Sequence, residues 1–135
     1  MAVTEPAGVL VVCIDDDASV LSGVARVVRR PGLEVRTSHD PDEVLGWVAN
    51  EIVAVLITDY EMPRMNGVVL ATRVRELRPQ TVCILLSGVV SSPIVGLEVE
   101  IFRFLGKPFD VRELRAAVAA ACDHHDDLVL RAATT

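Results

Sequence analysis

Lysine is almost absent from this sequence of 135 residues, and long apolar runs are missing. Lys107 is the only lysine among 13 basic residues, and 19 acidic residues give a net charge of −6. This balance excludes the concentrated positive charge of a nucleic-acid binder. No apolar run approaches the roughly 18 residues of a membrane span, and the first residues lack the positive charge of a secretory signal. These absences predict a cytoplasmic protein that binds neither nucleic acid nor membrane.

Cysteine and aromatic residues are also scarce. The three cysteines, Cys13, Cys83 and Cys122, are odd in number and lie among apolar neighbours, which indicates reduced core residues and not disulfides or a metal site. Hydrophobic residues make up 51% of the chain and charged residues 24%, which excludes a disordered protein. The length fits one domain over residues 1–135, with a core at about 8–122 and a helical extension or tail at 123–135.

Short apolar runs alternate with longer amphipathic stretches. The short runs are typical of strands buried on both faces of a sheet, and the longer stretches carry apolar residues at helical spacing. The predicted strands are Val9–Ile14, Leu33–Ser38, Ile52–Thr58, Val82–Leu86 and Ile101–Leu105. Of these, Leu33–Ser38 alternates between apolar and polar residues, which predicts an edge strand. The predicted helices are Ala18–Arg30, Pro41 to about Asn50, a helix from the Asn66-Gly67 turn to Arg78, a short irregular helix after Pro93, and a long helix from Asp110 to at least Cys122.

This alternation predicts an α/β fold. Five such units in this length fit a doubly wound, flavodoxin-like parallel sheet with strand order 2-1-3-4-5 and helices on both faces. In such a sheet the ligand crevice lies outside the carboxyl ends of the strands, where the strand order reverses.

Acidic residues and the one lysine follow the predicted strands at that edge. Asp15–Asp17 follow the first strand, Asp59 the third and Ser87 the fourth, and Lys107 comes shortly after the fifth. Crowded carboxylates repel one another unless a cation is present, and oxygen ligands favour Mg²⁺. Taken singly, Asp15–Asp17 could merely cap the first helix and Asp59 could merely open a turn. These roles do not explain why all of these acids lie at the same edge of the predicted sheet. The pattern therefore predicts a Mg²⁺ site.

A carboxylate, Mg²⁺, an ammonium and a hydroxyl together suit phosphoryl transfer. Mg²⁺ and Lys107 would neutralise the phosphoryl oxygens, and the Ser87 hydroxyl would donate to one of them. Asp59 is the candidate nucleophile, and its attack would form an aspartyl phosphate.

Four segments resemble the receiver domain of two-component response regulators, in that family's order and over roughly residues 8 to 122. The segments are Ile14-Asp15-Asp16-Asp17, Asp59 with Met62-Pro63 and Gly67, Leu86-Ser87-Gly88, and Phe104-Leu105-Gly106-Lys107-Pro108-Phe109. The resemblance implies a phosphorelay signalling module and not an enzyme, because such a domain catalyses only its own phosphorylation and dephosphorylation.

The resemblance also implies the roles of the acidic residues. Asp59 is the phosphoacceptor and one of the Mg²⁺ ligands. Asp16 is implied to bind Mg²⁺ directly, Asp15 mostly through water, and Glu61 through its backbone carbonyl.

Further implications concern the switch and the partners. Ser87 and Phe104 take the positions of the family's switch residues, and Lys107–Pro108 takes the position of a bond that is usually cis. The implied phosphoryl donor is a sensor histidine kinase or a phosphotransfer protein. A homodimer is predicted through the helix after Pro93, the strand Ile101–Leu105 and the Ala-rich helix, where Ala116, Ala119 and Ala120 allow close approach.

Two alternatives stay open on the sequence. The sequence also resembles a haloacid-dehalogenase-like phosphohydrolase with Asp15 as nucleophile, through the motif Asp15-x-Asp17, a later serine and a distant lysine. The other alternative is a module that keeps the fold and binds partners without being phosphorylated.

Overall fold

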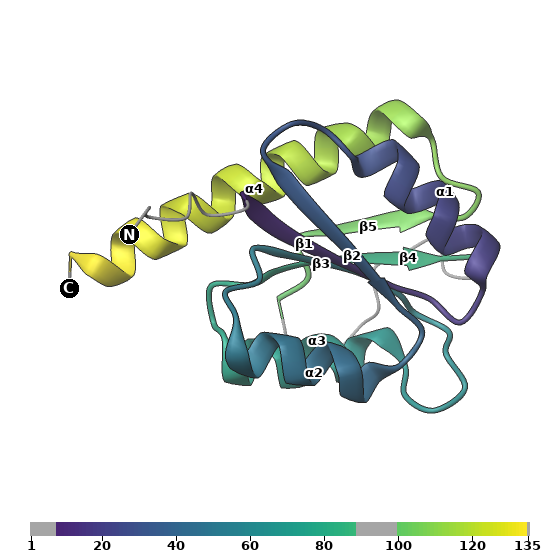
Figure 1. The fold of residues 1–135 in the computed structure, drawn as a ribbon, viewed down its shortest axis with the longest axis horizontal. Helices are drawn as coiled ribbons and strands as arrows, with labels where there is room; N and C mark the ends of the chain where they lie inside the picture. The colour runs from purple at the N-terminus through teal and green to yellow at the C-terminus, as the bar shows by residue number, and fades with distance from the viewer. Residues whose placement is uncertain (1–7, 89–99, 135) are drawn as a thin grey trace, which may run out of the picture.

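The computed structural model describes residues 8–88 and 100–134, and a five-stranded parallel sheet forms its centre (Figure 1). The strand order β2-β1-β3-β4-β5 confirms the predicted topology. The strands are β1 (Val9–Ile14), β2 (Leu33–Ser38), β3 (Val55–Asp59), β4 (Val82–Ser87) and β5 (Arg103–Gly106). The helices within the described residues are α1 (Ala18–Val28), α2 (Pro41–Asn50), α3 (Gly67–Leu77) and α4 (Val111–Ala133).

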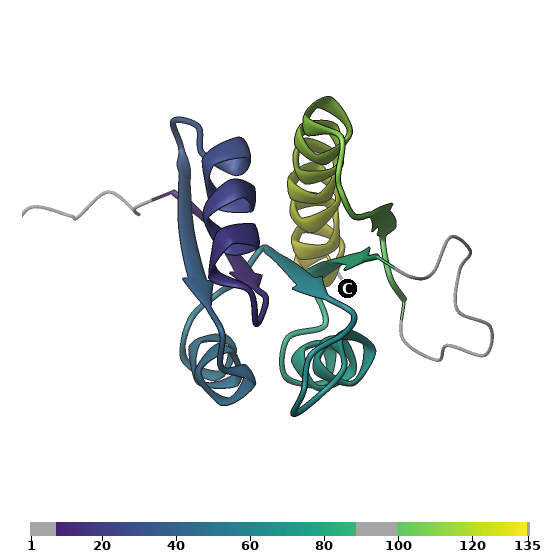
Figure 2. The same cartoon turned by 90° about the vertical axis from the view of Figure 1, so that its right-hand side faces the viewer.

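Helices cover both faces of the sheet. Figure 2 shows α1 and α4 on one face and α2 and α3 on the other. Each face has its own apolar cluster, because successive side chains of a strand point to opposite faces. Val11 and Cys13 of β1 pack towards α1 and α4, whereas Val12 and Ile14 pack towards α2 and α3. The central strands β3 and β4 are buried along their whole length, as the continuous apolar runs predict.

Each described helix begins at a polar residue whose side chain accepts backbone N–H groups of the first turn. Such caps satisfy amides that have no partner inside the helix. The cap residues are Asp17, Asp40, Asn66 and Asp110. Each of these four helices follows a strand in the chain, so each begins at the edge of the sheet where the strands have their carboxyl ends.

The predicted third strand begins too early. The sequence places its start at Ile52, but β3 begins at Val55, and Ile52 is 68% exposed. Glu51 caps the end of α2, so the next residues form the connection to the sheet although they are apolar. The fifth strand is likewise displaced, to Arg103–Gly106 from the predicted Ile101–Leu105. The predicted helix after Pro93 lies outside the described residues.

The last helix, α4, runs unbroken for 23 residues to Ala133. On the sequence alone, the adjacent His124 and His125 among acidic neighbours predict a solvated helix face, and this prediction is wrong for His125. His125 is buried, and its Nδ1 donates to the backbone carbonyl of Gln80 at 2.7 Å, while His124 stacks on Phe102. Both contacts arise because α4 continues past Cys122 along the sheet. Among the described residues, no helix has the length and apolar character needed to span a membrane.

Candidate phosphoryl-transfer site

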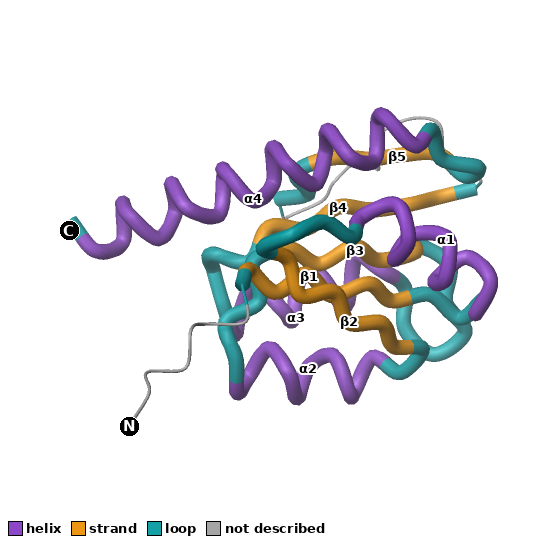
Figure 3. Tube along the Cα trace, turned by 45° about the horizontal axis from the view of Figure 1, so that its top comes forward, coloured by secondary structure: helices purple, strands orange, loops and turns teal. Residues whose placement is uncertain are grey.

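The predicted site residues meet at the carboxyl ends of the strands. Asp15 directly follows β1, Asp59 ends β3, Ser87 ends β4 and Lys107 directly follows β5. The tube in Figure 3 shows these strands side by side, so their ends share one edge of the sheet. The register pairs Asp59 with Leu86, next to Ser87. Parallel pairing thus brings together residues that lie up to 92 positions apart in the chain.

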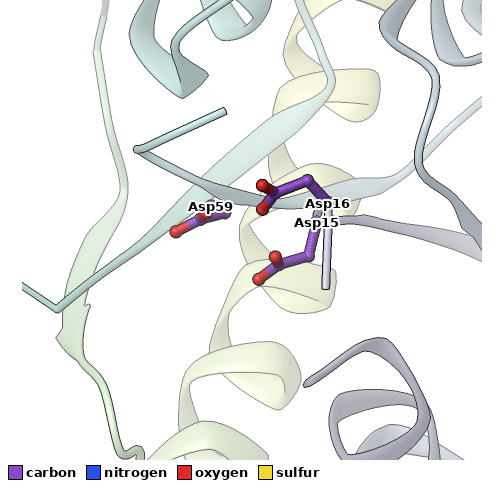
Figure 4. A group of neighbouring side chains, drawn as sticks. All are labelled: Asp15, Asp16 and Asp59. Atoms are coloured by element: carbon purple, nitrogen blue, oxygen red, sulfur yellow. The ribbon is translucent and has the colours of Figure 1, made fainter. Parts of the chain in front are cut away.

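Three carboxylates form the acidic centre of the site. One oxygen each of Asp15, Asp16 and Asp59 lies within 4.8 Å of the others. Figure 4 shows the Asp15 and Asp16 carboxylates pointing towards the side on which Asp59 lies. Asp15 and Asp59 are buried, at 2% and 4% exposure, whereas Asp16 is exposed. The cluster is therefore shielded from solvent on the side of Asp15 and Asp59 and open to solvent on the side of Asp16.

Lys107 joins the two buried carboxylates. Its Nζ lies 2.7 Å from Oδ2 of Asp15 and 2.9 Å from Oδ1 of Asp59. Partial burial disfavours the ammonium, but the hydrogen bonds from Lys107 to both aspartates outweigh that cost and raise its pKa. The only lysine of the chain is thus held as a cation between two acids. The Lys107–Pro108 bond is cis, as the resemblance implies.

The surroundings of Asp59 disfavour its negative charge. Burial raises the pKa of Asp59 above its ordinary value, the hydrogen bond from Lys107 acts against this shift, and the charge of Asp15 adds to it. The backbone N–H of Glu61 also donates to the Asp59 carboxylate. A second cation beside Lys107 would relieve the remaining repulsion.

The donor set fits Mg²⁺. Three carboxylates with converging oxygens provide the hard oxygen ligands that Mg²⁺ prefers, and the exposed Asp16 leaves room for bound waters. Within residues 8–88 and 100–134, this is the only group of three or more acidic, histidine or cysteine side chains that converge in this way.

The remaining predicted residues surround this centre. Ser87 is buried, and its backbone carbonyl accepts from the N–H of Lys107 at 2.9 Å. Phe104 lies on β5 opposite Leu85 and is half-buried. Glu61 is exposed just after β3. The structure thus brings Ser87 and Lys107 together through their strands, and it places Phe104 on the neighbouring edge strand.

Asp17 does not belong to the acidic cluster. Its side chain caps α1 by accepting from the hydroxyl and the backbone N–H of Ser19. These hydrogen bonds lower the pKa of Asp17. In addition, the backbone N–H of Asp17 donates to Oδ1 of Asp15 at 2.9 Å. Of the three consecutive acids, Asp15 and Asp16 are therefore candidate metal ligands, and Asp17 is a helix cap. The hydrogen bond from the Asp17 N–H also helps to orient the Asp15 carboxylate.

Gly67 supports the site in a way that the sequence does not reveal. It donates its N–H to the Tyr60 carbonyl at 2.9 Å, so the first turn of α3 lies against the end of β3. A Cβ at this position would overlap the backbone carbonyl of Asp59 and lie 2.8 Å from Cδ1 of Leu85. The Asn66-Gly67 pair signals a turn, but the close approach to Asp59 and Leu85 depends on how β3 and β4 pair in the sheet.

Gly67→Ala is expected to lower the free energy of unfolding by about 1–3 kcal/mol, because the added methyl must displace the Asp59 backbone. Urea denaturation measures the change. Gly46→Ala in α2 is the matched control. A Cβ there meets nothing within 4 Å, so the same substitution should stabilise the protein by roughly 0.5–1 kcal/mol through helix propensity. Equal effects at the two positions would contradict the role assigned to Gly67.

Comparison with known proteins agrees with this geometry. The family model for the response regulator receiver domain matches residues 11–119. The chain belongs to the response regulator receiver family. Receiver domains are signalling modules, so the family confirms the resemblance that the motifs indicate.

Relatives of this receiver domain include longer regulators. It is 33% identical over 109 residues to the DNA-binding transcriptional regulator NtrC of Azospirillum brasilense, a match covering 79% of this chain and 23% of that protein. It is 34% identical to the transcriptional regulatory protein PrrA of Mycobacterium tuberculosis, over 82% of this chain and 48% of that protein. The chain therefore spans less than half the length of these relatives.

Solved structures give the same fold. A signal receiver domain of an HD domain-containing protein from Pseudomonas fluorescens Pf-5 superposes with a TM-score of 0.79 at 26% identity, covering 89% of this chain and 98% of that one.

Proposed function

We propose that this receiver domain accepts a phosphoryl group on Asp59 in a Mg²⁺-dependent reaction. The observation that carries the proposal is the pair of contacts from Lys107 to Asp15 and Asp59, beside three converging carboxylates. Asp59 offers one oxygen to Lys107 and keeps a second oxygen as a nucleophile. A buried carboxylate whose pKa is raised is also more basic than a solvated one, which favours attack on phosphorus.

The phosphoryl donor is a phosphohistidine of a sensor histidine kinase or a phosphotransfer protein. A free oxygen of Asp59 attacks phosphorus, a P–O bond forms, the P–N bond to the donor imidazole breaks, and the imidazole keeps the electron pair. Asp15, Asp16, Asp59 and the carbonyl of Glu61 would hold Mg²⁺, which supplies positive charge for the phosphoryl oxygens. Lys107 supplies a second positive charge from the β5 side, and the Ser87 hydroxyl donates to a phosphoryl oxygen.

The resulting switch involves the β4–β5 edge of the sheet. A shift of Ser87 towards the phosphoryl group would open space near β4, into which the half-buried Phe104 would turn. Phenylalanine has no hydroxyl that must find a partner, so its inward state carries no polar desolvation cost. A phosphorylation-promoted homodimer through β5, the Ala-rich part of α4 and the helix predicted after Pro93 remains a proposal. Ala116 is exposed, and Ala119 and Ala120 are half-buried.

The test is incubation of the full chain with acetyl phosphate in the presence and absence of Mg²⁺. Intact-mass spectrometry is expected to show one added phosphoryl group, stable in acid and labile in base, only when Mg²⁺ is present. Absence of the adduct would favour the phosphorylation-independent interaction module. Sustained release of phosphate from many small phosphate esters would instead favour the phosphohydrolase alternative.

A further inference from the structure

Three arginines surround a small pocket between α1 and α4, the two helices that lie on the same face of the sheet (Figure 2). Arg29 and Arg30 directly follow the end of α1, and Arg115 lies in the second turn of α4. The pocket has a volume of about 100 Å³, and three valines complete its lining. We call it the arginine pocket. Because α1 leads from the carboxyl end of β1 to the start of β2, the pocket lies about 16 Å along the helix from the Asp59 edge.

The positive charge of the arginine pocket is not balanced within the protein. Residues 27–33 and 114–122, which form its two sides, contain no acid. In the described part of the chain, Arg36, Arg64 and Arg75 each form an ion pair with a carboxylate, whereas the three pocket arginines form none. The carboxyl end of α1 offers them only about half a negative charge. An anion that enters the pocket would therefore relieve their mutual repulsion.

Two of the three guanidinium groups are already positioned by the protein. Nε of Arg115 donates to the backbone carbonyl of Val27 at 3.2 Å, which fixes one edge of the group and leaves its Nη atoms for a ligand. Arg30 lies beside the Cys122 thiol, where its charge acts against the rise in the thiol pKa that burial causes. Side chains that are oriented before binding lose less freedom when a ligand arrives.

Two acids of α4, Asp123 and Asp126, also act on the Cys122 thiol and therefore lie on the Arg30 side of the pocket. Both are exposed, and within residues 8–88 and 100–134 neither forms an ion pair with an arginine. Exposed charges are screened by water and salt. These acids thus reduce the excess of positive charge but do not fill the pocket.

We propose that the arginine pocket binds the phosphate group of a small, soluble phosphate monoester. Guanidinium groups match phosphate oxygens with paired N–H donors, and the group carries a charge of about −1.5 to −2, more than one carboxylate can offer three arginines. A pocket of about 100 Å³ has room for one such group and not for a polymer. The net charge of −6 repels nucleic acids and anionic membranes. Binding requires neither Mg²⁺ nor phosphorylation of Asp59.

NMR titration of the ¹⁵N-labelled full chain with inorganic phosphate and with glycerol 3-phosphate tests the proposal, in Mg²⁺-free buffer at constant ionic strength. The Nε–H signals of Arg29, Arg30 and Arg115 are expected to shift in a saturable way with both ligands. Arg115→Gln is expected to raise the Kd of glycerol 3-phosphate roughly tenfold, because it removes a charge-assisted contact. Arg29→Gln should do the same without disturbing the Val27 contact. Shifts that rise linearly without saturation would overturn the proposal.

Arg73→Gln is the matched control. Arg73 is exposed on α3, on the opposite face of the sheet, and it forms no ion pair with a described residue. The substitution removes the same single charge as Arg29→Gln, so it is expected to leave the Kd of glycerol 3-phosphate unchanged. Equal weakening by the two substitutions would show that net charge, and not the arginine pocket, causes binding, and would overturn the proposal.

Two further ligands test the chemical class and its source. Acetate, a carboxylate, is expected to bind at least tenfold more weakly than glycerol 3-phosphate, and equal affinity would overturn the assignment to phosphate. Vesicles of phosphatidylcholine and phosphatidic acid present the same phosphate monoester on a membrane. The chain is expected to remain in the supernatant when these vesicles are sedimented. Co-sedimentation that Arg29→Gln abolishes would confirm the phosphate site but overturn the soluble source in favour of a lipid headgroup.

Discussion

Asp59→Asn is expected to reduce phosphoryl incorporation from acetyl phosphate to background while leaving a folded and more stable protein. The amide cannot act as the nucleophile, and no other acid of the site lies at the end of the central strand β3. Asp42→Asn, an exposed carboxylate on α2, is the control that should keep full labelling. Full labelling of Asp59→Asn would exclude Asp59 as the phosphoacceptor and favour Asp15, as in the phosphohydrolase alternative.

The stability of Asp59→Asn should depend on pH in a defined direction. Because burial raises the pKa of Asp59 in the folded state, the wild type is destabilised as pH rises through the interval from the unfolded to the folded pKa. The asparagine variant lacks this loss. In metal-free buffer its melting temperature should exceed that of the wild type at neutral pH, and the difference should shrink as the pH falls through that interval. A difference independent of pH would contradict the assigned cause.

Lys107→Met is expected to cost about 3 kcal/mol of unfolding free energy at neutral pH in metal-free buffer, or about 10 °C in melting temperature. The substitution leaves Asp15 and Asp59 as two buried carboxylates without their shared counter-ion. Lowering the pH should recover part of the loss, since protonation removes the unpaired charge. Millimolar Mg²⁺ should also recover part of it. Binding to the folded state alone contributes about 2.7 kcal/mol at a hundredfold excess over Kd.

Arg64→Met is the matched control for this experiment. Arg64 also contacts two carboxylates, Asp40 and Asp42, but its side chain is 61% exposed. Exposed pairs contribute at most about 1 kcal/mol, so this variant should change little and should not respond to Mg²⁺. If Lys107→Met were as stable as Arg64→Met in metal-free buffer, the buried ion pairs would not stabilise the fold.

Several features of the site follow from short stretches of sequence. Continuous apolar runs predict strands buried on both faces, and an acid or a serine directly after such a run must lie at the carboxyl edge of a parallel sheet. This reasoning places Asp15, Asp59 and Ser87 correctly, because it depends only on the order of strands and helices. Helix starts are predicted equally well, since Asp40 and Asp110 cap their helices through local contacts.

Other features depend on contacts between distant segments. Ile52 belongs to an apolar run, yet it is exposed, because β3 pairs with β1 and β4 only from Val55 onwards. His125 looks like a surface residue beside polar neighbours, but α4 carries it over the Gln80 carbonyl. Periodicity reports whether a residue shares a face with its neighbours on one element. It does not report what the rest of the chain places against that face.

The sequence by itself determined the α/β fold, the strand order and the acids, hydroxyl and lysine that share one edge of the sheet. Only the tertiary structure decided that Lys107 contacts Asp15 and Asp59 at once, that His125 is buried against the Gln80 carbonyl, and that Gly67 must lack a side chain against the Asp59 carbonyl. Fold class arises from hydrophobic patterning over neighbouring residues, which a linear sequence displays directly. Hydrogen bonds, burial and close backbone approach depend on distances of a few ångströms between segments far apart in the chain, and those distances exist only once the sheet has formed.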